Sequence, residues 1–392
     1  MFQSRYLEPY ILADMNKKMV FIGGPRQVGK TTLALHIGEQ IYQNRTYLNW
    51  DNSEHRRRMM KQEFPKETGL IIFDEIHKYR LWKNYVKGIY DTYQDSLRIL
   101  VTGSARLDLY RRGGDSLFGR YRYYRLHPFS VRELLGEKWT GEPFVELPFL
   151  PQAPGEFLMH RLLEFGGFPE PLFAEDHQTL RRFHTERTER LIKEDIRDVE
   201  RVHDLSLLQL LADMVPEKVA SLLSIHSIAE DLSASHKTIA HWVDILERFY
   251  YHYRIYPYTS KKIRSLKKQP KLYLWDWSEI QDPAVRLENM VASHLLKTVH
   301  LLYDFFGYKA DLFFLRDTAG REVDFLVAVN GKPWFSVEVK SRDTQVSPHL
   351  FYFGKKLHIP FQYQVVAEGL EHDMVYKGVN IMRLDHFLSG LA

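Results

Sequence analysis

The residues with the most specific chemical pattern form a glycine-rich loop near the N-terminus. An apolar run, Met19–Ile22, leads into a segment that fits G-x-x-x-x-G-K-[ST], and an apolar helical pattern follows. In this order, backbone N–H groups surround phosphate oxygens, a lysine contacts the β- and γ-phosphates, and a hydroxyl binds Mg²⁺. We therefore predict a site for ATP and Mg²⁺, with Lys30 as a catalytic cation and Thr31 as a metal ligand. The predicted nucleotide-binding residues of the loop are Gly24, Pro25, Arg26, Gln27, Val28, Gly29, Lys30, Thr31 and Thr32.

Two acids at the end of another apolar run complete this chemistry. The segment Gly69–Glu75 reads Gly-Leu-Ile-Ile-Phe-Asp-Glu, which is typical of a buried parallel strand whose carboxyl end opens on a ligand site. We expect Asp74 to bind the cofactor through the Mg²⁺ shell. Glu75 is predicted to orient and deprotonate the attacking water, which requires a carboxylate at hydrogen-bond distance, ~3 Å.

A third apolar run, Arg98–Ser104, ends in small polar residues. Thr102 and Ser104 are both candidates for a contact with the γ-phosphate, although ordinary turn chemistry explains them equally well, and we include Ser104 in the nucleotide site. Further along, Arg106 and Arg120 are both candidates for stabilising the transition state, within one chain or across a subunit boundary. Arg120 is the arginine predicted to be catalytic.

The last third of the chain carries a second set of chemical residues. Glu288 lies in a predicted helix, Pro283–Leu296, and two strands follow it, over 321–329 and 334–340. Strand alternation places Asp324 on one face of the first strand, and Glu338 with Lys340 on one face of the second. A helical Glu, a strand Asp and a strand Glu-x-Lys form the arrangement of the PD-(D/E)xK nuclease superfamily, although Glu-x-Lys pairs are also common on surfaces. The predicted catalytic residues are Glu288, Asp324, Glu338 and Lys340, with Asp324 and Glu338 as metal ligands.

The turn between these two strands decides whether the two acids meet. A two-residue Asn330-Gly331 loop pairs Val329 with Lys332 and leaves Asp324 and Glu338 on opposite faces. A three-residue loop with a left-handed Gly331 instead brings the acids directly opposite each other, with Cβ atoms ~5 Å apart. We predict the three-residue loop.

The middle of the chain reads as helices followed by a winged helix. Helical patterns cover 156–165, 177–201 and 205–214, and a capping box of Ser227 and Glu230 begins a further helix. Ser235 is the expected N-cap of a helix over 236–248, and an aromatic, β-prone run follows. The segment 261–271 is basic and has no acid, which favours DNA contact, although winged helices also bind proteins and basic stretches are often only solvated. The predicted DNA-binding residues are Lys237, His241, Lys261, Lys262, Arg264, Lys267 and Lys268.

Composition limits the class of protein. The 392 residues include no cysteine, which excludes disulfides, thiolate zinc sites and cysteine nucleophiles. A formal charge of +4 is too small to indicate a nucleic-acid partner by itself. The N-terminus lacks the apolar core of a signal peptide, and no apolar run is long enough to span a bilayer, so we expect a soluble, cytoplasmic protein without a membrane partner.

Taken together, the chain resembles the bacterial and archaeal AAA-type ATPases that end in the domain of unknown function 4143. The segments that carry the resemblance are 24–33, 71–77, 102–104, 116–120, 322–325 and 337–340. The resemblance implies an additional-strand P-loop core that hydrolyses ATP, a winged helix, and a C-terminal domain similar to Holliday-junction resolvases and other restriction-like nucleases. The sequence departs from helicase-linked nucleases in having no clear glutamine motif that would position water.

These observations predict an α/β multidomain protein. The expected parts are a P-loop AAA-type core with a parallel sheet over 1–140, a helical connector over 141–205, a winged helix over 206–260, and a restriction-endonuclease-like PD-(D/E)xK domain over 261–392. The first functional hypothesis is an ATP-hydrolysing enzyme that remodels or processes branched or broken DNA, with or without cleavage by the C-terminal domain. The second is a nucleotide-dependent switch whose C-terminal domain only binds DNA or a protein. A homo-oligomer is expected, and a ring is compatible with an arginine supplied across subunits.

Overall fold

The computed structural model describes residues 3–64, 69–103, 107, 117–197, 204–259 and 268–392. Six of the predicted residues lie outside these ranges: Ser104, Arg106, Lys261, Lys262, Arg264 and Lys267. The chain divides into two compact units, one made of Met1–His127 with Arg248–Tyr250 and the other of Pro128–Glu247 with Tyr251–Ala392. Within the described ranges, no helix has both the length and the apolar character needed to cross a membrane.

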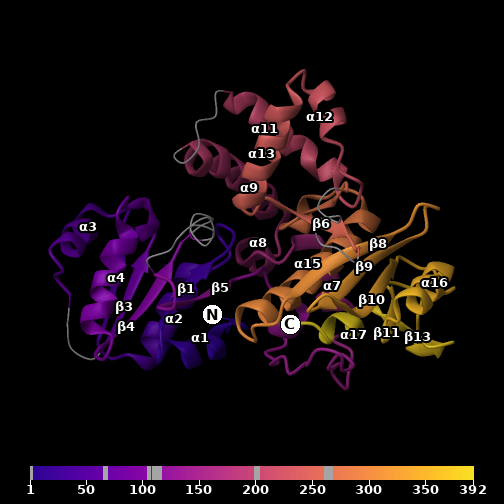
Figure 1. Ribbon diagram of the computed structural model, residues 1–392, viewed down its shortest axis with the longest axis horizontal. Coiled ribbons are helices and arrows are strands. Elements are labelled where there is room, and N and C mark those ends of the chain that lie inside the picture. The colour runs from indigo at the N-terminus through magenta and orange to yellow at the C-terminus, as the bar shows by residue number, and fades with distance from the viewer. Residues whose placement is uncertain (1–2, 65–68, 104–106, 108–116, 198–203, 260–267) are drawn as a thin grey trace. The chain divides into compact units, whose positions relative to one another are not determined.

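The first unit is built on a five-stranded parallel sheet with the strand order β2-β3-β4-β1-β5 (Figure 1). Its strands are β1 (Met19–Gly23), β2 (Arg45–Asn49), β3 (Gly69–Asp74), β4 (Leu97–Thr102) and β5 (Tyr121–Arg125). The strand that carries the glycine loop, β1, is separated from the acidic strand β3 by β4. This inserted strand is the additional strand that the family resemblance implied.

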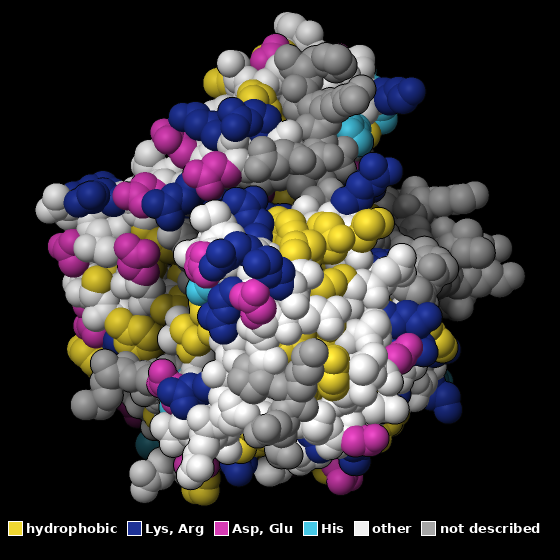
Figure 2. Space-filling view, turned by 90° about the vertical axis from the view of Figure 1, so that its left-hand side faces the viewer, with side chains coloured by type: hydrophobic (Ala, Val, Ile, Leu, Met, Phe, Trp, Pro, Cys, Tyr) yellow, Lys and Arg dark blue, Asp and Glu magenta, His cyan; other side chains and the backbone are white. Residues whose placement is uncertain are grey.

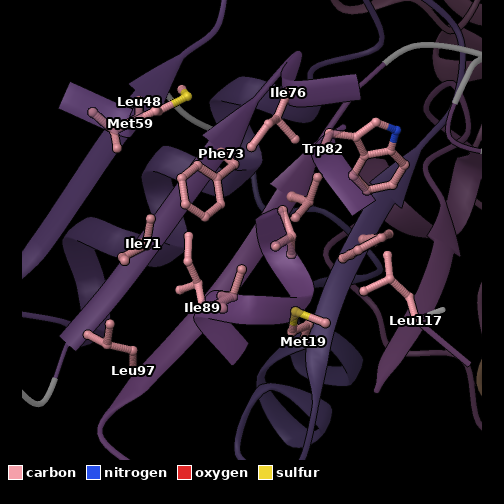
Figure 3. Packing of buried hydrophobic residues seen from close by; sticks show 14 of the residues in the cluster. Met19, Leu48, Met59, Ile71, Phe73, Ile76, Trp82, Ile89, Leu97 and Leu117 are labelled. Carbon is pink, nitrogen blue, oxygen red and sulfur yellow. The ribbon is translucent and has the colours of Figure 1, made fainter. Parts of the chain in front are cut away.

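Helices cover both faces of this sheet. They are α1 (Glu8–Met15), α2 (Lys30–Ile41), α3 (Ser53–Met60) and α4 (Trp82–Tyr93), together with the short helix η1 (Ile76–Lys78). Alternate strand residues such as Ile71 and Phe73 pack with Met59 of α3 and Trp82 of α4 in one hydrophobic core (Figure 3). The helix that follows the glycine loop, α2, contacts β3 and β4. Because the strands are parallel and buried on both sides, their carboxyl ends share one edge, where ligands bind in such sheets.

The second unit contains an eight-stranded mixed sheet with the order β12-β13-β11-β10-β9-β8-β6-β7. Its strands are β6 (His252–Pro257), β7 (Lys271–Leu274), β8 (Ala310–Arg316), β9 (Glu322–Val329), β10 (Lys332–Lys340), β11 (Phe361–Val366), β12 (Met374–Tyr376) and β13 (Val379–Arg383). The central strands β8, β9 and β10 are antiparallel, whereas β10, β11 and β13 run parallel to each other.

The helices of the second unit precede and flank this sheet. They are α6 (Val131–Leu134), α7 (Glu156–Phe165), α8 (Pro169–Ala174), α9 (His177–Arg190), η3 (Leu191–Ile196), α11 (Leu205–Met214), η4 (Val215–Lys218), α12 (Ile225–Asp231), α13 (His236–Arg248), η5 (Trp277–Glu279), α15 (Pro283–Asp304), α16 (Pro348–Leu357) and α17 (Leu384–Ser389). The long helix α15 extends eight residues past its predicted end at Leu296 and contacts β7, β8, β9 and β10. A core of Val323, Leu326 and Leu350 packs α16 against the sheet.

Helices α12 and α13 and the β6–β7 hairpin follow the order of a winged helix, as predicted. The predicted cap of α12 is wrong: Ser224, not Ser227, accepts the capping hydrogen bond, and the helix begins at Ile225. Ser235 accepts from Thr238 N at 3.1 Å, which confirms the predicted cap of α13. Strand β6 also pairs with β8, so the wing is continuous with the large sheet.

Candidate functional site

The glycine loop connects the carboxyl end of β1 to the N-terminus of α2. Gly24 has φ +139° and lies so close to the backbone that an added Cβ would stand 2.4 Å from the Leu126 carbonyl oxygen. Lys30 is 8% exposed, and its Nζ donates to the carbonyl oxygens of Gly24 at 3.0 Å and Pro25 at 2.6 Å. The lysine therefore lies across the loop, within reach of an anion that the loop would hold.

A buried arginine that the sequence analysis missed supports this loop. Arg5 is 4% exposed, and its guanidinium donates to the carbonyl oxygens of Val28 and His127, each at 2.6 Å. Arginine donors in a fixed fork fit two carbonyls at once. Arg5 thus fixes the glycine loop to the segment that follows β5. It belongs to no recognised sequence motif.

Asp74 is the centre of a hydroxyl cluster at the carboxyl edge of the sheet. The carboxylate is 4% exposed and accepts from Thr31 Oγ1 at 3.0 Å, Tyr47 OH at 2.7 Å and Thr102 Oγ1 at 2.6 Å. Burial and the hydrogen bond to Asp74 raise the pKa of Tyr47, so its hydroxyl stays protonated and donates. The predicted metal ligands Thr31 and Asp74 are therefore adjacent, and Thr102 holds the carboxylate from the neighbouring strand.

Glu75 has an unusual backbone and two basic neighbours. Its φ of 54° lies in the left-handed region, which is uncommon for a residue with a side chain and is frequent at functional sites. The Oε2 atom lies 3.5 Å from Nε2 of the buried His77 and 3.9 Å from Nζ of Lys78. An added Cβ at Gly103 would stand 2.5 Å from His77 Nδ1, so this glycine leaves the space that the imidazole fills.

Arg120 lies at the amino ends of the strands of the same sheet, opposite the carboxyl ends where the glycine loop lies. It accepts a backbone hydrogen bond from Met19, the first residue of β1, and its guanidinium pairs with Asp91 at 2.7 Å. Since β1 spans five residues, this position is about 15 Å along the strand from the glycine loop. Arg120 therefore lies far from the loop in its own chain, and its guanidinium pairs with Asp91.

The predicted loop between β9 and β10 is wrong. Asn330 and Gly331 both have positive φ, 53° and 79°, and form a two-residue turn in which Val329 pairs with Lys332. The pairing then shifts by one residue between Pro333 and Phe335, so that Val337 faces Phe325.

A β-bulge at Trp334 causes this shift. Its indole is fully buried and Nε1 donates to the Val145 carbonyl at 2.9 Å, which holds the extra residue out of the ladder. The shifted register places Asp324 and Glu338 across from each other. The two acids meet as predicted, but through the bulge and not through a longer turn.

The paired acids are held in a defined geometry. Asp324 Oδ2 accepts from Val339 N at 2.8 Å, and Lys340 Nζ lies 2.8 Å from Glu338 Oε1. Glu338 is 6% exposed, and no donor among the described residues contacts its buried Oε2. Burial and the neighbouring Glu338 charge raise the pKa of Asp324, and burial likewise raises the pKa of Glu338.

Glu288 approaches the same acids from helix α15. Its Oε1 accepts from Tyr273 OH at 2.7 Å and lies 3.6 Å from Nζ of Lys271. Burial and the Asp324 charge raise the pKa of Glu288 to about 7. Lys271 and Tyr273 were not predicted, although they alternate along β7 at the end of the basic segment and so share one face.

The carboxylates do not form a preassembled metal cage. Among the residues that the structure describes, no group of three or more His, Cys, Asp and Glu side chains is arranged to hold a metal ion. Glu288 instead contacts Tyr273 and Lys271, which leaves Asp324 and Glu338 as the pair that can share an ion.

Three known families match separate parts of the chain. Residues 16–135 match the AAA domain family, and residues 286–387 match the domain of unknown function DUF4143. The chain combines an AAA domain with a DUF4143 domain. The AAA domain contains the glycine loop with Asp74 and Glu75, and the DUF4143 domain contains the paired acids. Between them, residues 156–278 match a further domain of unknown function, DUF8612.

Several known proteins match large parts of this chain at low identity. An uncharacterized protein of Haemophilus influenzae is 23% identical, and the match covers 94% of this chain and 96% of that protein. The protein MJ1637 of Methanocaldococcus jannaschii is 26% identical over 67% of this chain and 62% of its own length. The RuvB Holliday junction branch migration motor of Thermotoga maritima is a solved structure that is 16% identical, with a TM-score of 0.29 over 63% of this chain and 87% of its own. The strand order of the first unit defines its fold.

The DUF8612 region contains the described part of the predicted DNA-binding set. Lys237 and His241 are exposed on α13, opposite the buried Ile239 and Val243, and Lys268 is exposed before β7. On the face shown in Figure 2, Lys and Arg side chains alternate with Asp and Glu among the described residues and form no continuous basic stripe.

Proposed function

We propose that this protein is an ATP-hydrolysing enzyme that binds and processes DNA, with the C-terminal acids acting on the phosphodiester backbone through a divalent cation. The observation that carries the proposal is the presence, in one chain, of a P-loop site and a separate Asp324–Glu338–Lys340 site. An acid pair with a lysine is a common way to hold a metal ion at a phosphate.

In the AAA domain, each residue would have a distinct task. Lys30 exchanges the carbonyl oxygens of Gly24 and Pro25 for phosphate oxygens. Thr31 and Asp74 hold Mg²⁺, which when bound shields the phosphate charge. Glu75 orients the attacking water and takes its proton.

A homo-oligomer would complete the ATPase site. Arg120 lies at the opposite end of β1 from the loop, so its charge is available only to a neighbouring copy after it leaves Asp91. A ring or another closed assembly satisfies this requirement for every subunit.

In the DUF4143 domain, the feature that fits a cation is Glu338 Oε2, which no donor among the described residues contacts. A buried carboxylate oxygen without a donor is costly unless a ligand satisfies it. Asp324 and Glu338 would hold a divalent metal, which when bound supplies an activated water, and Lys340 would steady the phosphate. The exposed Lys237, His241 and Lys268, with the basic segment 261–267, would bind the DNA backbone.

The test is DNA cleavage and binding by the full chain in Mg²⁺ or Mn²⁺. Linear duplex, single-stranded and four-way-junction DNA are compared in the wild type, in Glu338→Gln, and in Glu371→Gln, an exposed carboxylate of the same domain that serves as the matched control. We expect metal-dependent cleavage that Glu338→Gln abolishes and Glu371→Gln retains.

Two outcomes would change the proposal. DNA binding and ATP turnover without cleavage in either metal would leave a motor or a nucleotide-dependent switch whose C-terminal domain only binds. The absence of DNA binding at moderate salt would remove both DNA functions.

A further inference from the structure

A lysine from the wing lies among the carboxylates of the DUF4143 domain. Lys271 is the first residue of β7 and the last residue of the basic segment, yet it is only 5% exposed. Its Nζ lies 2.5 Å from Glu322 Oε1 and 3.6 Å from Glu288 Oε1. A buried ammonium at these distances is a fixed part of the site and not a solvated surface charge.

Lys271 is anchored by the strand that carries it. Two residues further along, Tyr273 donates to Glu288 at 2.7 Å, and the backbone of Leu274 exchanges two hydrogen bonds with the side chain of Asn289, at 2.7 and 2.8 Å. These contacts join β7 to helix α15 beside Glu288. The backbone of Lys271 is therefore held beside the carboxylates.

The two lysines contact different acids. Nζ of Lys271 lies against Glu288 and Glu322, and its charge also acts on Asp324, whereas Nζ of Lys340 lies 2.8 Å from Glu338 Oε1. The atoms left for a cation are those of the Asp324–Glu338 pair, including the unpartnered Glu338 Oε2. Sites with two metals place the ions about 3.5–4 Å apart and bridge them with shared carboxylates, and an ammonium between neighbouring acids opposes a second ion there.

We infer that the DUF4143 site takes one divalent cation, held by Asp324 and Glu338, and that the ammonium of Lys271 takes the place of a second. The inference rests on the proposed metal site but goes beyond it. It states how many divalent cations the site binds, and it states that Lys271, a residue of the wing, limits that number. Lys271 is thus a positioning residue that holds Glu288 away from the ion.

The experiment counts Mn²⁺ ions bound by the nucleotide-free full chain, using calorimetry and electron paramagnetic resonance. All variants carry Asp74→Asn, which removes the carboxylate of the P-loop metal site. We expect one Mn²⁺ in this parent, one in Lys271→Arg, two spin-coupled ions in Lys271→Met and none in Glu338→Gln. Circular dichroism confirms that each variant is folded.

Each outcome decides a different point. Two ions in the parent, or one ion in a folded Lys271→Met variant, would overturn the inference while leaving a metal site in place. No ion in the parent would overturn the metal site of the proposed function itself. If Lys271→Met does not fold, the parent count, with Lys271→Arg beside it, still separates one ion from two.

Discussion

Asn289 provides the sharpest test of how the second unit positions its acids. This fully buried amide accepts from Leu274 N at 2.7 Å and donates to Leu274 O at 2.8 Å. Since β7 is the end strand of the sheet, Asn289 thereby supplies hydrogen bonds to the N–H and C=O of Leu274 on the side without a neighbouring strand of that sheet. Asn289→Leu has nearly the same shape but leaves both groups unpaired in the interior. At ~1–3 kcal/mol for each unsatisfied group, the expected loss is roughly 2–6 kcal/mol, a large part of the ~5–15 kcal/mol that typically stabilises a domain.

The loss is measured by urea unfolding followed by circular dichroism and tryptophan fluorescence. Asn84→Leu, the same substitution at an exposed position on α4, is the matched control and is expected to change stability by less than ~0.5 kcal/mol. A loss of stability below ~1 kcal/mol in Asn289→Leu would refute the reasoning, since it would mean that water or another group satisfies the strand.

Three further predictions concern single contacts. Tyr47→Phe removes one hydroxyl from Asp74 and is expected to raise the Mg²⁺ concentration for half-maximal ATP turnover by roughly tenfold; an unchanged Mg²⁺ dependence would argue against this role. Lys297→Met removes the ammonium that lies 2.5 Å from the buried Glu133 carboxylate, at a cost of ~3–5 kcal/mol, and the double variant with Glu133→Gln should recover most of it in urea unfolding. The pKa of the buried His294 is lowered to about 4 by burial, so its contribution to stability, at most ~3 kcal/mol, is complete above pH 6.5 and is lost as the pH falls towards 4. Unfolding of wild type and His294→Gln across this range checks it, because the variant should lack that part of the pH dependence.

The ATPase half of the molecule could be predicted from sequence because its signals are local. The glycine loop, the apolar runs and the acids that follow them lie within short segments, and parallel strands bring their carboxyl ends to one edge. The sequence could not show which distant residues hold the glycine loop and the acids in place. Arg5 and Tyr47 reach Val28 and Asp74 across sequence separations of 23 and 27 residues and belong to no motif.

The acidic site shows how local rules fail when tertiary packing intervenes. The two-residue Asn330-Gly331 turn follows the usual preference of the dipeptide, and by itself it would have separated Asp324 from Glu338. Burial of the Trp334 indole against Val145 inserts a bulge and restores the pairing. Such a bulge depends on a partner 189 residues away in the chain, and the strand pattern does not report it.

Lys271 is the clearest residue that sequence reasoning did not place in the acidic site. It ends the basic segment 261–271, for which the sequence favoured DNA contact, but strand alternation with Tyr273 turns it towards Glu288. The pairing of β7 with β6, and of β6 with β8, makes the wing part of the large sheet and so brings a wing residue to the acids. Only the long-range strand order reveals this.

The most direct test of the central claim, that one chain couples a P-loop ATPase to DNA, is steady-state ATP hydrolysis by the full chain titrated with four-way-junction DNA. We predict that DNA raises ATP turnover several-fold in the wild type, and that Lys30→Ala abolishes turnover with or without DNA. Two results together would contradict the account: no form of DNA changes ATP turnover, and the protein does not bind DNA at moderate salt.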